Sequence, residues 1–540
     1  MLRPGLMMDR PLLISGIIEH AAAQFGEVEI VSRESHGPLH RYAYAECAAR
    51  ARRLANALEA LGLDAGGGVG TIACNTHRHL ETYFAVSGSG MVLHTCNPRL
   101  HPAQLIYIVN HAEDRVMFFD RGYAPLIEEL APQCPLVTTW ICLCEPADMP
   151  SIPGVRNLCC YEDFIAGCAE RFEWPQFDER TAAALCYTSG TTGDPRGALY
   201  SHRSIILNAL SCCLPGVFSL SSRDAILGVV PMFHVNGWCI PYAAPIAGAR
   251  LILPGQRLDG AGLYELIEAE GVTVSGGVPT IWLSLIRHVE ENRLQFSTLK
   301  RLLVGGSAMP VALIAKYADE YGIDVRHGWG MTETVGVATM GALDGQQCEW
   351  PPARRHGVIA RQGKALFGVQ IKVIDEYGAE LPRDGCSQGE LMVRGQWIVE
   401  QYYKGEASPL VDGWFATGDI ATIDARGTLQ IRDRAKDLIK SGGEWISSID
   451  LENAAVGHTA VAMAAVIGVK HPRWVERPLL FIVRKPQCTL EREEILAYLA
   501  QQVVKWWLPE EVIFLDSLPV GGTGKVQKAL LRERYGRLFD

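Results

Sequence analysis

The 540-residue chain has no excess of basic residues. It contains 50 Lys and Arg against 60 Asp and Glu, which gives a formal net charge of −10. This balance argues against a dedicated nucleic-acid-binding protein, because such proteins normally carry a basic surface. Charged residues make up only 20% of the chain and hydrophobic residues 48%, whereas disordered chains combine high charge with low hydrophobicity. The composition therefore indicates a folded globular protein, and the chain is long enough for large hydrophobic cores.

A long hydrophobic run is also missing. No stretch of about eighteen apolar residues occurs, so the sequence predicts no membrane span. The apolar run Pro11–Ile18 near the N-terminus ends at Glu19, and it lacks the long apolar region and the cleavage site of a signal peptide. We therefore expect an amphipathic helix here, and a protein that resides in the cytoplasm.

Regularly spaced cysteines are absent as well. The 16 cysteines are scattered, some of them as adjacent pairs such as Cys159–Cys160, and no CxxC pair occurs. This pattern does not indicate a disulfide framework and is typical of a reduced, cytosolic protein. Glycine, in contrast, is abundant at 54 residues, which indicates many tight turns and close backbone approaches.

Short apolar segments alternate with segments of helical periodicity in the first part of the chain. The runs 71–74, 116–119 and 137–142 predict buried strands, and residues 46–61 have apolar positions at helical spacing before Gly62. Such alternation is typical of parallel sheets in an α/β fold. Glycine-punctuated strands follow at 369–374, 389–393 and 428–431, and their shorter turns indicate a mixed or antiparallel sheet.

A domain boundary is predicted near residues 433–440. Beyond it, the pattern predicts a helix at 449–455, strands at 464–469 and 479–483, and a helix at 492–504. Residues 434–540 contain 15 Lys and Arg against 13 Asp and Glu, so the acidity of the chain resides in residues 1–433. We therefore divide the chain into parts 1–433 and 434–540.

The most informative segment is CYTSGTTGDPRG, residues 186–197. Glycines let backbone amides face a phosphate, hydroxyl groups donate further hydrogen bonds, and Arg196 supplies positive charge. By itself, such a loop is equally compatible with a polar surface loop, and it is not a Walker A loop, because no Gly-Lys-Ser/Thr follows. The residues expected to contact phosphate are Thr188, Ser189, Gly190, Thr191, Thr192, Gly193 and Arg196.

This loop resembles the signature loop of the adenylate-forming superfamily, which comprises acyl-CoA synthetases, luciferases and peptide-synthetase adenylation domains. Four further motifs of the superfamily follow in order: HGWGMTET (327–334), GWFATGD (413–419), RDRAKDLIKSGGEWIS (432–447) and GGTGK (521–525). The motifs span residues 186–525, and the first 185 residues fit the first subdomain of the superfamily. In one departure, Arg196 stands where the superfamily usually has lysine, which keeps the charge but changes the geometry of phosphate binding.

The resemblance implies a fold and a reaction. Residues 1–433 would form an AMP- and acyl-binding domain of stacked α/β subdomains plus a β-rich subdomain, and residues 434–540 a small, mobile α/β domain with its hinge at Lys436. A carboxylate would attack the α-phosphate of ATP to give an acyl-adenylate and pyrophosphate, and coenzyme A would then displace AMP. The resemblance implies ATP and Mg²⁺ as cofactors and coenzyme A as a co-substrate.

The resemblance also assigns roles to single residues. Lys525 would bridge the substrate carboxylate and the nucleotide, whereas Lys528 lies outside the motif and is expected to be a surface charge. Glu333 would bind Mg²⁺ with help from the hydroxyl of Thr188, since Mg²⁺ usually takes one or two carboxylates. Thr332 would contact the α-phosphate. The other expected nucleotide contacts are Trp329 against adenine, Asp419 at the ribose hydroxyls, and Gly305, Gly306, Ser307, Ala308, His327, Gly328, Gly330, Ile431 and Arg434.

Residues 232–238 (MFHVNGW) resemble the substrate-gate motif of the superfamily. His234 would position the acyl group or block the thiol tunnel. The acidic residue that binds the α-ammonium group in amino-acid-activating relatives is absent here, which disfavours an amino-acid substrate. The expected acyl pocket consists of His234, Trp238, Gly305, Gly330, Met331 and Val335. The expected coenzyme A loop consists of Lys440, Ser441, Gly442, Gly443 and Trp445.

The N-terminal stretch and the phosphate-loop region resemble those of bacterial medium-chain fatty-acid–CoA ligases. Because the expected pocket is apolar and offers no cation for a second carboxylate, the sequence favours a medium-chain acyl-CoA synthetase. Alternatives within the fold are a CoA ligase for a short substituted acid such as methylthiopropionate or for an aryl acid, transfer to a carrier-protein thiol, and oxidative luciferase chemistry. An alternative of another class is a non-catalytic nucleotide-binding sensor. The oligomeric state stays open, with a homodimer as one alternative.

Overall fold

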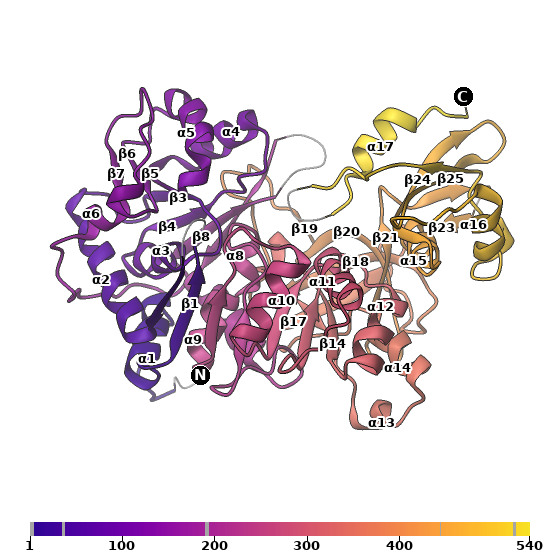
Figure 1. Ribbon diagram of the computed structural model, residues 1–540, viewed down its shortest axis with the longest axis horizontal. Coiled ribbons are helices and arrows are strands. Elements are labelled where there is room, and N and C mark those ends of the chain that lie inside the picture. Colours follow the sequence, from indigo (N-terminus) through magenta and orange to yellow (C-terminus); the bar gives the residue numbers. More distant parts are fainter. Residues whose placement is uncertain (1–4, 35–37, 189–193, 443, 522–524, 540) are drawn as a thin grey trace.

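The computed structural model of the chain describes residues 5–34, 38–188, 194–442, 444–521 and 525–539. In these residues the strands form four sheets of nine, seven, five and five strands. Figure 1 shows the C-terminal residues, in orange and yellow, as a separate lobe beside the much larger remainder of the chain. The predicted α/β class, with a large N-terminal and a small C-terminal domain, is confirmed.

The nine-stranded sheet has the order β16-β15-β14-β13-β12-β10-β11-β1-β2. Its strands are β1 Glu29–Arg33, β2 Leu39–Ala43, β10 Ala225–Leu227, β11 Arg250–Leu253, β12 Val274–Gly277, β13 Arg301–Val304, β14 Asp324–Trp329, β15 Thr339–Met340 and β16 Lys364–Ala365. The central strands are parallel, and antiparallel strands lie at both edges. Val304 pairs with His327. Because parallel strands end at the same edge of a sheet, the segments after β13 and at the end of β14 lie side by side.

The seven-stranded sheet has the order β7-β6-β5-β3-β4-β8-β9. Its strands are β3 Gly68–Ile72, β4 Val92–Thr95, β5 Asp114–Phe119, β6 Thr139–Cys142, β7 Leu158–Cys160, β8 Ala182–Tyr187 and β9 Gly197–Ser201. Only β9 is antiparallel to its neighbour, with Tyr187 opposite Gly197. The phosphate loop is therefore the connection of a hairpin at the carboxyl end of β8, and its residues 189–193 lie outside the described part of the chain.

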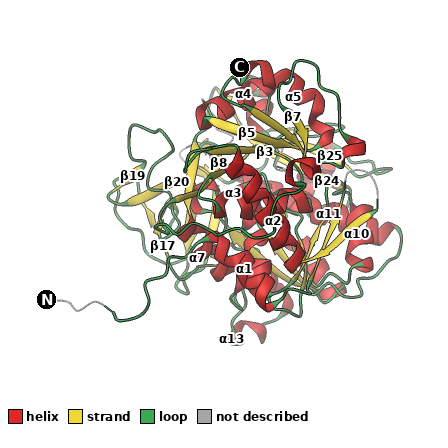
Figure 2. Ribbon diagram, turned by 90° about the vertical axis from the view of Figure 1, so that its left-hand side faces the viewer, coloured by secondary structure: helices red, strands yellow, loops and turns green. Residues whose placement is uncertain are grey.

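Helices cover these two sheets. They are α1 Ile14–Gln24, α2 Tyr44–Ala60, α3 His77–Gly88, α4 Pro102–Ala112, α5 Ala124–Leu130, α6 Tyr161–Ile165, α7 His202–Cys213, α8 Val235–Trp238, α9 Ile240–Ala247, α10 Gly260–Ala269, α11 Pro279–Glu291, α12 Val311–Ala315, α13 Gly345–Cys348 and α14 Pro352–Ile359. Every residue of α3 is buried, and this helix contacts β1 of one sheet and β4 and β8 of the other, at the centre of the view in Figure 2. The two sheets thus share one core. As predicted, α1 is amphipathic and buries Ile14, Ile17, Ile18 and Ala21.

The β-rich subdomain is the antiparallel sheet that the sequence predicts. Its strands are β17 Val369–Ile374, β18 Gly389–Gly395, β19 Leu410–Val411, β20 Trp414–Ile423 and β21 Leu429–Arg434. A turn at residues 435–437, which contains Lys436, leads from β21 into β22 of the C-terminal sheet.

The C-terminal domain has one mixed sheet and three α-helices in its described residues. They are β22 Ile439–Ser441, β23 Glu444–Ile446, β24 Val461–His471, β25 Val475–Arg484 and β26 Glu511–Phe514, with α15 Ser448–Val456, α16 Arg492–Leu499 and α17 Lys528–Tyr535. The prediction that the helix extends to Val504 is wrong, since α16 ends at Leu499. Residues 500–502 form a turn instead, and further on the guanidinium of Arg477 donates to the carbonyls of Trp506 at 2.8 Å and Leu508 at 2.9 Å.

Candidate active site

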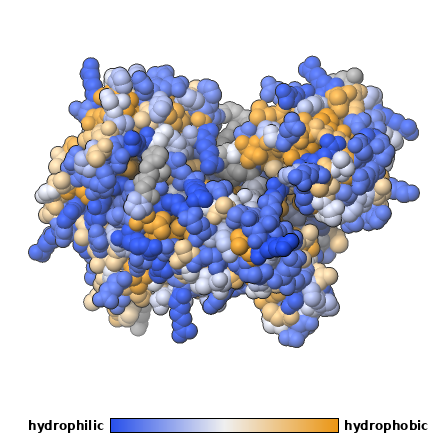
Figure 3. Space-filling view, in the orientation of Figure 1, coloured by the Kyte–Doolittle hydropathy of each residue, from blue (hydrophilic) through white to orange (hydrophobic). Residues whose placement is uncertain are grey.

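A cleft of about 2060 Å³ lies between the two domains, where the surface in Figure 3 is hollowed. The predicted site residues that line it are Thr188, Arg196, His234, Trp238, Gly305, Gly306, Ser307, Ala308, His327, Gly328, Trp329, Gly330, Met331, Thr332, Glu333, Asp419, Ile431, Arg434, Lys436 and Lys525. These residues come from strands of two sheets and the segments next to them, from the ends of the β8–β9 connection, from the turn after β21 and from the chain just before α17. The fold therefore collects the separate sequence motifs around one cavity.

Trp329, at the end of β14, and Asp419, in β20, are in direct contact. The indole Nε1 of Trp329 donates to Oδ2 of Asp419 at 2.9 Å, and Nε of Arg434 lies 2.9 Å from Oδ1. Asp419 is only 2% exposed. Burial raises the pKa of its carboxyl, and the charge of Arg434 opposes that rise. The carboxylate is thus oriented by two donors at the position expected for ribose binding.

His327 and Gly330 shape the wall on either side of Trp329. The ring of His327 lies between the carbonyls of Ala360, 2.9 Å from Nδ1, and Ser307, 3.2 Å from Nε2, and burial lowers the pKa of this imidazole. A Cβ at Gly330 would lie 1.5 Å from the carbonyl oxygen of Gly336. No side chain fits there without movement of the backbone, so this glycine is required by the close approach of two segments.

Lys525 extends into the cleft from the C-terminal domain. Its Cε lies 3.5 Å from where a Cβ would stand on Gly306. Solvent reaches the side chain through the open cleft, but the surrounding protein desolvates the ammonium and Arg434 repels it, so the pKa of Lys525 is lowered to about 8. Burial, with a smaller contribution from Lys525, lowers the pKa of His234 to about 3. The imidazole of His234 is therefore neutral and faces the same space as the ammonium.

The turn that carries Trp238 has an uncommon backbone. Val235, Asn236, Trp238 and Cys239 have φ between 45° and 59°, and Gly237 lies among them at 62°. Residues other than glycine pay a steric cost in this region, which persists only where the surrounding structure imposes it. The indole of Trp238 comes within 2.9 Å of a Cβ built on Gly305. The strained turn therefore holds the indole of Trp238 against Gly305, in the segment that follows β13.

Glu333 lies in a short 3-10 turn at Thr332–Thr334 and is 6% exposed. The hydroxyl of Tyr402 donates to its Oε1 at 2.7 Å, and the hydroxyl of Tyr200 donates to the carbonyl of Thr332 at 2.6 Å. The guanidinium of Arg196 lies 4.5 Å from the centre of the Tyr402 ring. Sequence reasoning missed Tyr402. The only available signal was an aromatic pair, Tyr402–Tyr403, in a loop without a recognised motif.

The residues predicted to bind coenzyme A lie elsewhere. Of the described residues predicted for the acyl pocket or for coenzyme A, Val335, Lys440, Ser441, Gly442 and Trp445 do not line the cleft. Ser441 is buried and accepts a hydrogen bond from Arg477 at 3.1 Å, whereas the side chain of Trp445 is exposed. Gly443, like Ser189, Gly190, Thr191, Thr192 and Gly193, lies outside the described residues.

The expectation that Lys528 is a surface charge is wrong. Its Nζ lies 2.7 Å from Oε1 of Glu452 and donates to the hydroxyl of Ser448 at 2.6 Å. Its side chain is 13% exposed. Lys528 therefore fastens the start of α17 to α15 inside the C-terminal domain.

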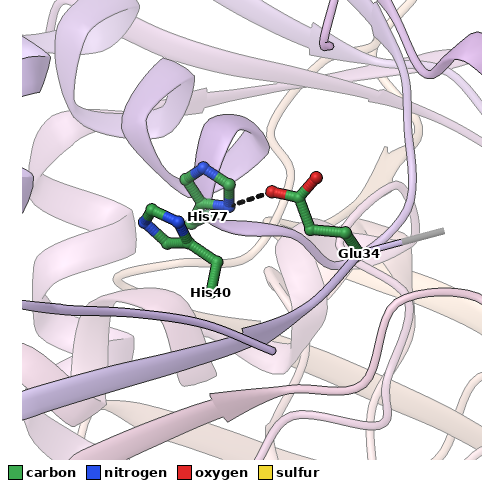
Figure 4. A group of neighbouring side chains, drawn as sticks. All are labelled: Glu34, His40 and His77. Atoms are coloured by element: carbon green, nitrogen blue, oxygen red, sulfur yellow. Dashed lines mark ion pairs between the residues drawn. The ribbon is translucent and has the colours of Figure 1, made fainter. Parts of the chain in front are cut away.

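A second polar cluster lies beside α3, away from the cleft. The rings of His40 and His77 stack with centroids 3.8 Å apart, and Nδ1 of His77 faces Glu34 at 3.4 Å (Figure 4). Arg78 pairs with the same Glu34 carboxylate at 3.0 Å. Burial, followed by the charge of Arg78, lowers the pKa of His77. We interpret the cluster as packing of two neutral imidazoles beside an ion pair.

Two family models match the chain. The AMP-binding enzyme model matches residues 18–403, and the AMP-binding enzyme C-terminal domain model matches residues 450–525. The chain therefore belongs to the AMP-binding enzyme family, whose motifs the sequence carries.

Characterised relatives match over nearly the full length. The 3-methylmercaptopropionyl-CoA ligase of Ruegeria lacuscaerulensis is 46% identical over 98% of each chain. The medium-chain-fatty-acid–CoA ligase of Ectopseudomonas oleovorans is 45% identical over 99% of this chain and 98% of its own. The crystal structure of ATP-bound MatB from Rhodopseudomonas palustris superposes with a TM-score of 0.82 at 28% identity, covering 97% of this chain and 100% of that one.

Proposed function

We propose that the chain is an ATP-dependent acyl-CoA ligase that activates a carboxylic acid as acyl-AMP and transfers the acyl group to coenzyme A, with release of AMP and pyrophosphate. The observation that carries the proposal is the gathering of Thr188, Glu333, Asp419 and Lys525 in one cleft between the domains. The near full-length similarity to CoA ligases supports the same reaction.

The first half-reaction brings two anions together, and the cleft supplies cations for it. The ammonium of Lys525 is free to approach the substrate carboxylate and the α-phosphate, where charge develops in the transition state. Arg196 would hold the outer phosphates, and Asp419 would accept the ribose hydroxyls while Trp329 and Arg434 fix its orientation. Holding the carboxylate and the α-phosphate in line converts a bimolecular step into an effectively unimolecular one.

The residues around Glu333 fit a magnesium ion. A carboxylate and the hydroxyl of Thr188 line the same cavity, and Mg²⁺ prefers one or two carboxylates completed by phosphate and water oxygens. When bound, the ion would neutralise charge on the phosphates. Glu333 and Thr188 are the residues that would hold it.

For the second half-reaction, we propose that the C-terminal domain rotates about Lys436. That residue lies in the turn between β21 and β22, where the β-rich sheet ends and the C-terminal sheet begins. Rotation there would withdraw Lys525 and bring the segment Lys440–Trp445 to the acyl-adenylate. The positions of these residues outside the cleft agree with an adenylation arrangement, in which the coenzyme A segment has yet to enter.

The proposed acid is a medium-chain fatty acid, since the cleft residues Trp238, Gly305, Gly330 and Met331 are uncharged. A second candidate is a short substituted acid such as 3-methylmercaptopropionate. The contact between Trp238 and Gly305 favours it, because the indole occupies space that a longer chain would need.

The test is thioester formation from a panel of straight-chain acids from C3 to C16, with 3-methylmercaptopropionate and benzoate added, in the presence of ATP, Mg²⁺ and coenzyme A. We expect the highest kcat/KM for a medium-chain acid and stoichiometric release of AMP. A best substrate shorter than C5, or an aryl acid, would contradict the proposed chain length. Thioester formation without AMP release would contradict the reaction itself.

We further propose a cytoplasmic location. All 16 cysteines lie in the described residues and are free, which is typical of a reducing compartment. No described helix is both long and apolar enough to cross a bilayer. The partners are the three small substrates, and homodimer formation is a further proposal that gel filtration with light scattering would test.

A further inference from the structure

The loop segment 399–404, between β18 and β19, contacts three separate parts of the fold, two of which adjoin the site. The backbone N–H of Val399 donates to the carbonyl of Glu333, and that of Tyr403 donates to the carbonyl of Gly197, both at 2.8 Å. Nζ of Lys404 donates to Oε1 of Glu113 at 2.7 Å and to the carbonyl of His111 at 2.9 Å, where α4 ends. The segment is thus fixed to the turn of Glu333, to β9 after the phosphate loop and to the end of α4.

Tyr402 is the residue of this segment that extends between Glu333 and Arg196. It is 8% exposed. Its hydroxyl donates to Oε1 of Glu333 at 2.7 Å, and the guanidinium of Arg196 lies over its ring, 4.5 Å from the centroid. One buried side chain therefore contacts both the carboxylate expected to hold Mg²⁺ and the cation expected to hold phosphate.

Each contact restricts a group that would otherwise be free to turn. A donor on one oxygen fixes the plane of the Glu333 carboxylate, which orients its remaining lone pairs. Arg196 is exposed at its other side, and a long exposed side chain loses much conformational freedom when it is immobilised. The planar guanidinium stacks on an aromatic face, and a lysine ammonium in its place would make only a point contact.

We propose that Tyr402 is a positioning residue that sets the carboxylate of Glu333 and the guanidinium of Arg196 relative to each other, so that metal and phosphates are bound together. This inference rests on the proposed function, because it assigns Glu333 to the metal and Arg196 to the phosphates. It also accounts for the arginine at position 196: the aromatic ring of Tyr402 gives that guanidinium a surface on which to lie.

The test separates the hydroxyl from the ring. In Tyr402→Phe the ring stays, so we expect Mn²⁺ to bind about tenfold more weakly to the complex with a non-hydrolysable ATP analogue, as for the loss of a hydrogen bond to a charged group. Affinity for the analogue without metal should stay unchanged. In Tyr402→Leu we expect this affinity to fall as well, by about fivefold for the lost stacking. Mn²⁺ binding is followed by electron paramagnetic resonance and analogue binding by calorimetry.

A double-mutant cycle with Arg196→Lys completes the test. Arg196→Lys should weaken metal-free analogue binding in the unsubstituted protein and have little further effect in Tyr402→Leu. Tyr377→Phe, at a tyrosine that is 87% exposed in the same subdomain, is the matched control and should change neither affinity. Unchanged Mn²⁺ binding in Tyr402→Phe, or additive effects in the cycle, would overturn the proposal. Failure of the proposed function would differ, because the unsubstituted chain would then bind no metal–nucleotide complex and form no thioester.

Discussion

The indole Nε1 of Trp329 donates a 2.9 Å hydrogen bond to Oδ2 of Asp419, ninety positions further along the chain. The bond joins the end of a strand in the nine-stranded sheet to a strand of the β-rich sheet. It couples the residue expected at adenine to the residue expected at ribose, so the two contacts should respond together to substitution.

Substitution of Asp419 by Asn should raise the KM for ATP about tenfold or more. The change removes the charge that compensates Arg434 and weakens the acceptor, and hydrogen bonds to charged groups are worth about 1.5–3 kcal/mol. Trp329→Phe keeps an aromatic face but loses the donor, so we expect a smaller rise. ATP-dependent pyrophosphate exchange measures both. Trp350→Phe, at a tryptophan outside the cleft, is the control, and an equal rise in that variant would contradict the assignment.

Lys525→Ala and Lys528→Ala, only three positions apart, should have opposite effects. Because Lys525 makes no ion pair among the described residues and is open to solvent, its replacement should abolish pyrophosphate exchange and leave stability nearly unchanged. Replacement of Lys528 leaves Glu452 without its partner, a change that typically costs about 3 kcal/mol for a buried pair.

Denaturant unfolding of both variants, combined with the exchange assay, distinguishes the two roles. Thioester formation from chemically prepared acyl-AMP should persist in Lys525→Ala, since only the first half-reaction needs the ammonium. Normal pyrophosphate exchange in Lys525→Ala would refute its catalytic assignment. Unaltered stability in Lys528→Ala would refute the structural role of its ion pair.

The activity should also depend on pH through Lys525. Its pKa is lowered to about 8, and the protonated form is the one that stabilises negative charge. The kcat/KM for ATP should therefore be constant with respect to this group below its pKa and fall as the pH rises through about 8. Lys525→Arg should be slower but lose this alkaline fall, because a guanidinium stays protonated. A wild-type profile that stays level up to about pH 9.5 would contradict the lowered pKa.

Gly330→Ala tests the close packing beneath the nucleotide. With a Cβ only 1.5 Å from the carbonyl of Gly336, we expect a loss of about 3 kcal/mol in the free energy of unfolding. Gly345→Ala is the matched control, because nothing lies within 4 Å of its Cβ and exposed substitutions usually change stability by less than about 0.5 kcal/mol. Equal stability of the two variants in urea would show that the backbone at Gly330 is free to relax.

Short-range patterns predicted strands of the sheets and most of the predicted site residues that line the cleft, because the motifs place these residues next to one another in sequence. The roles of Tyr402 and Lys528 depend on contacts that no local pattern reveals. Tyr402 meets Glu333 sixty-nine positions away and Lys528 meets Ser448 eighty positions away. The end of α16 at Leu499 likewise has no marker in the sequence pattern, which predicts a helix to Val504. A residue that lies outside the recognised motifs and finds its partner in a distant element is one that the sequence could not assign.

The anchoring of Lys528 has a further consequence for the lysine three positions before it. The carbonyl of Lys525 accepts a 2.7 Å hydrogen bond from the backbone N–H of Gly521, and Val520 pairs with Val526 in an isolated bridge. Because these two contacts hold Lys525 to the C-terminal domain, the proposed rotation of that domain would carry Lys525 with it. The ammonium would then leave the nucleotide at the rate at which the whole domain rotates through solvent. If that rotation limits turnover, an added viscogen should lower kcat. If a chemical step limits turnover, kcat should not depend on viscosity.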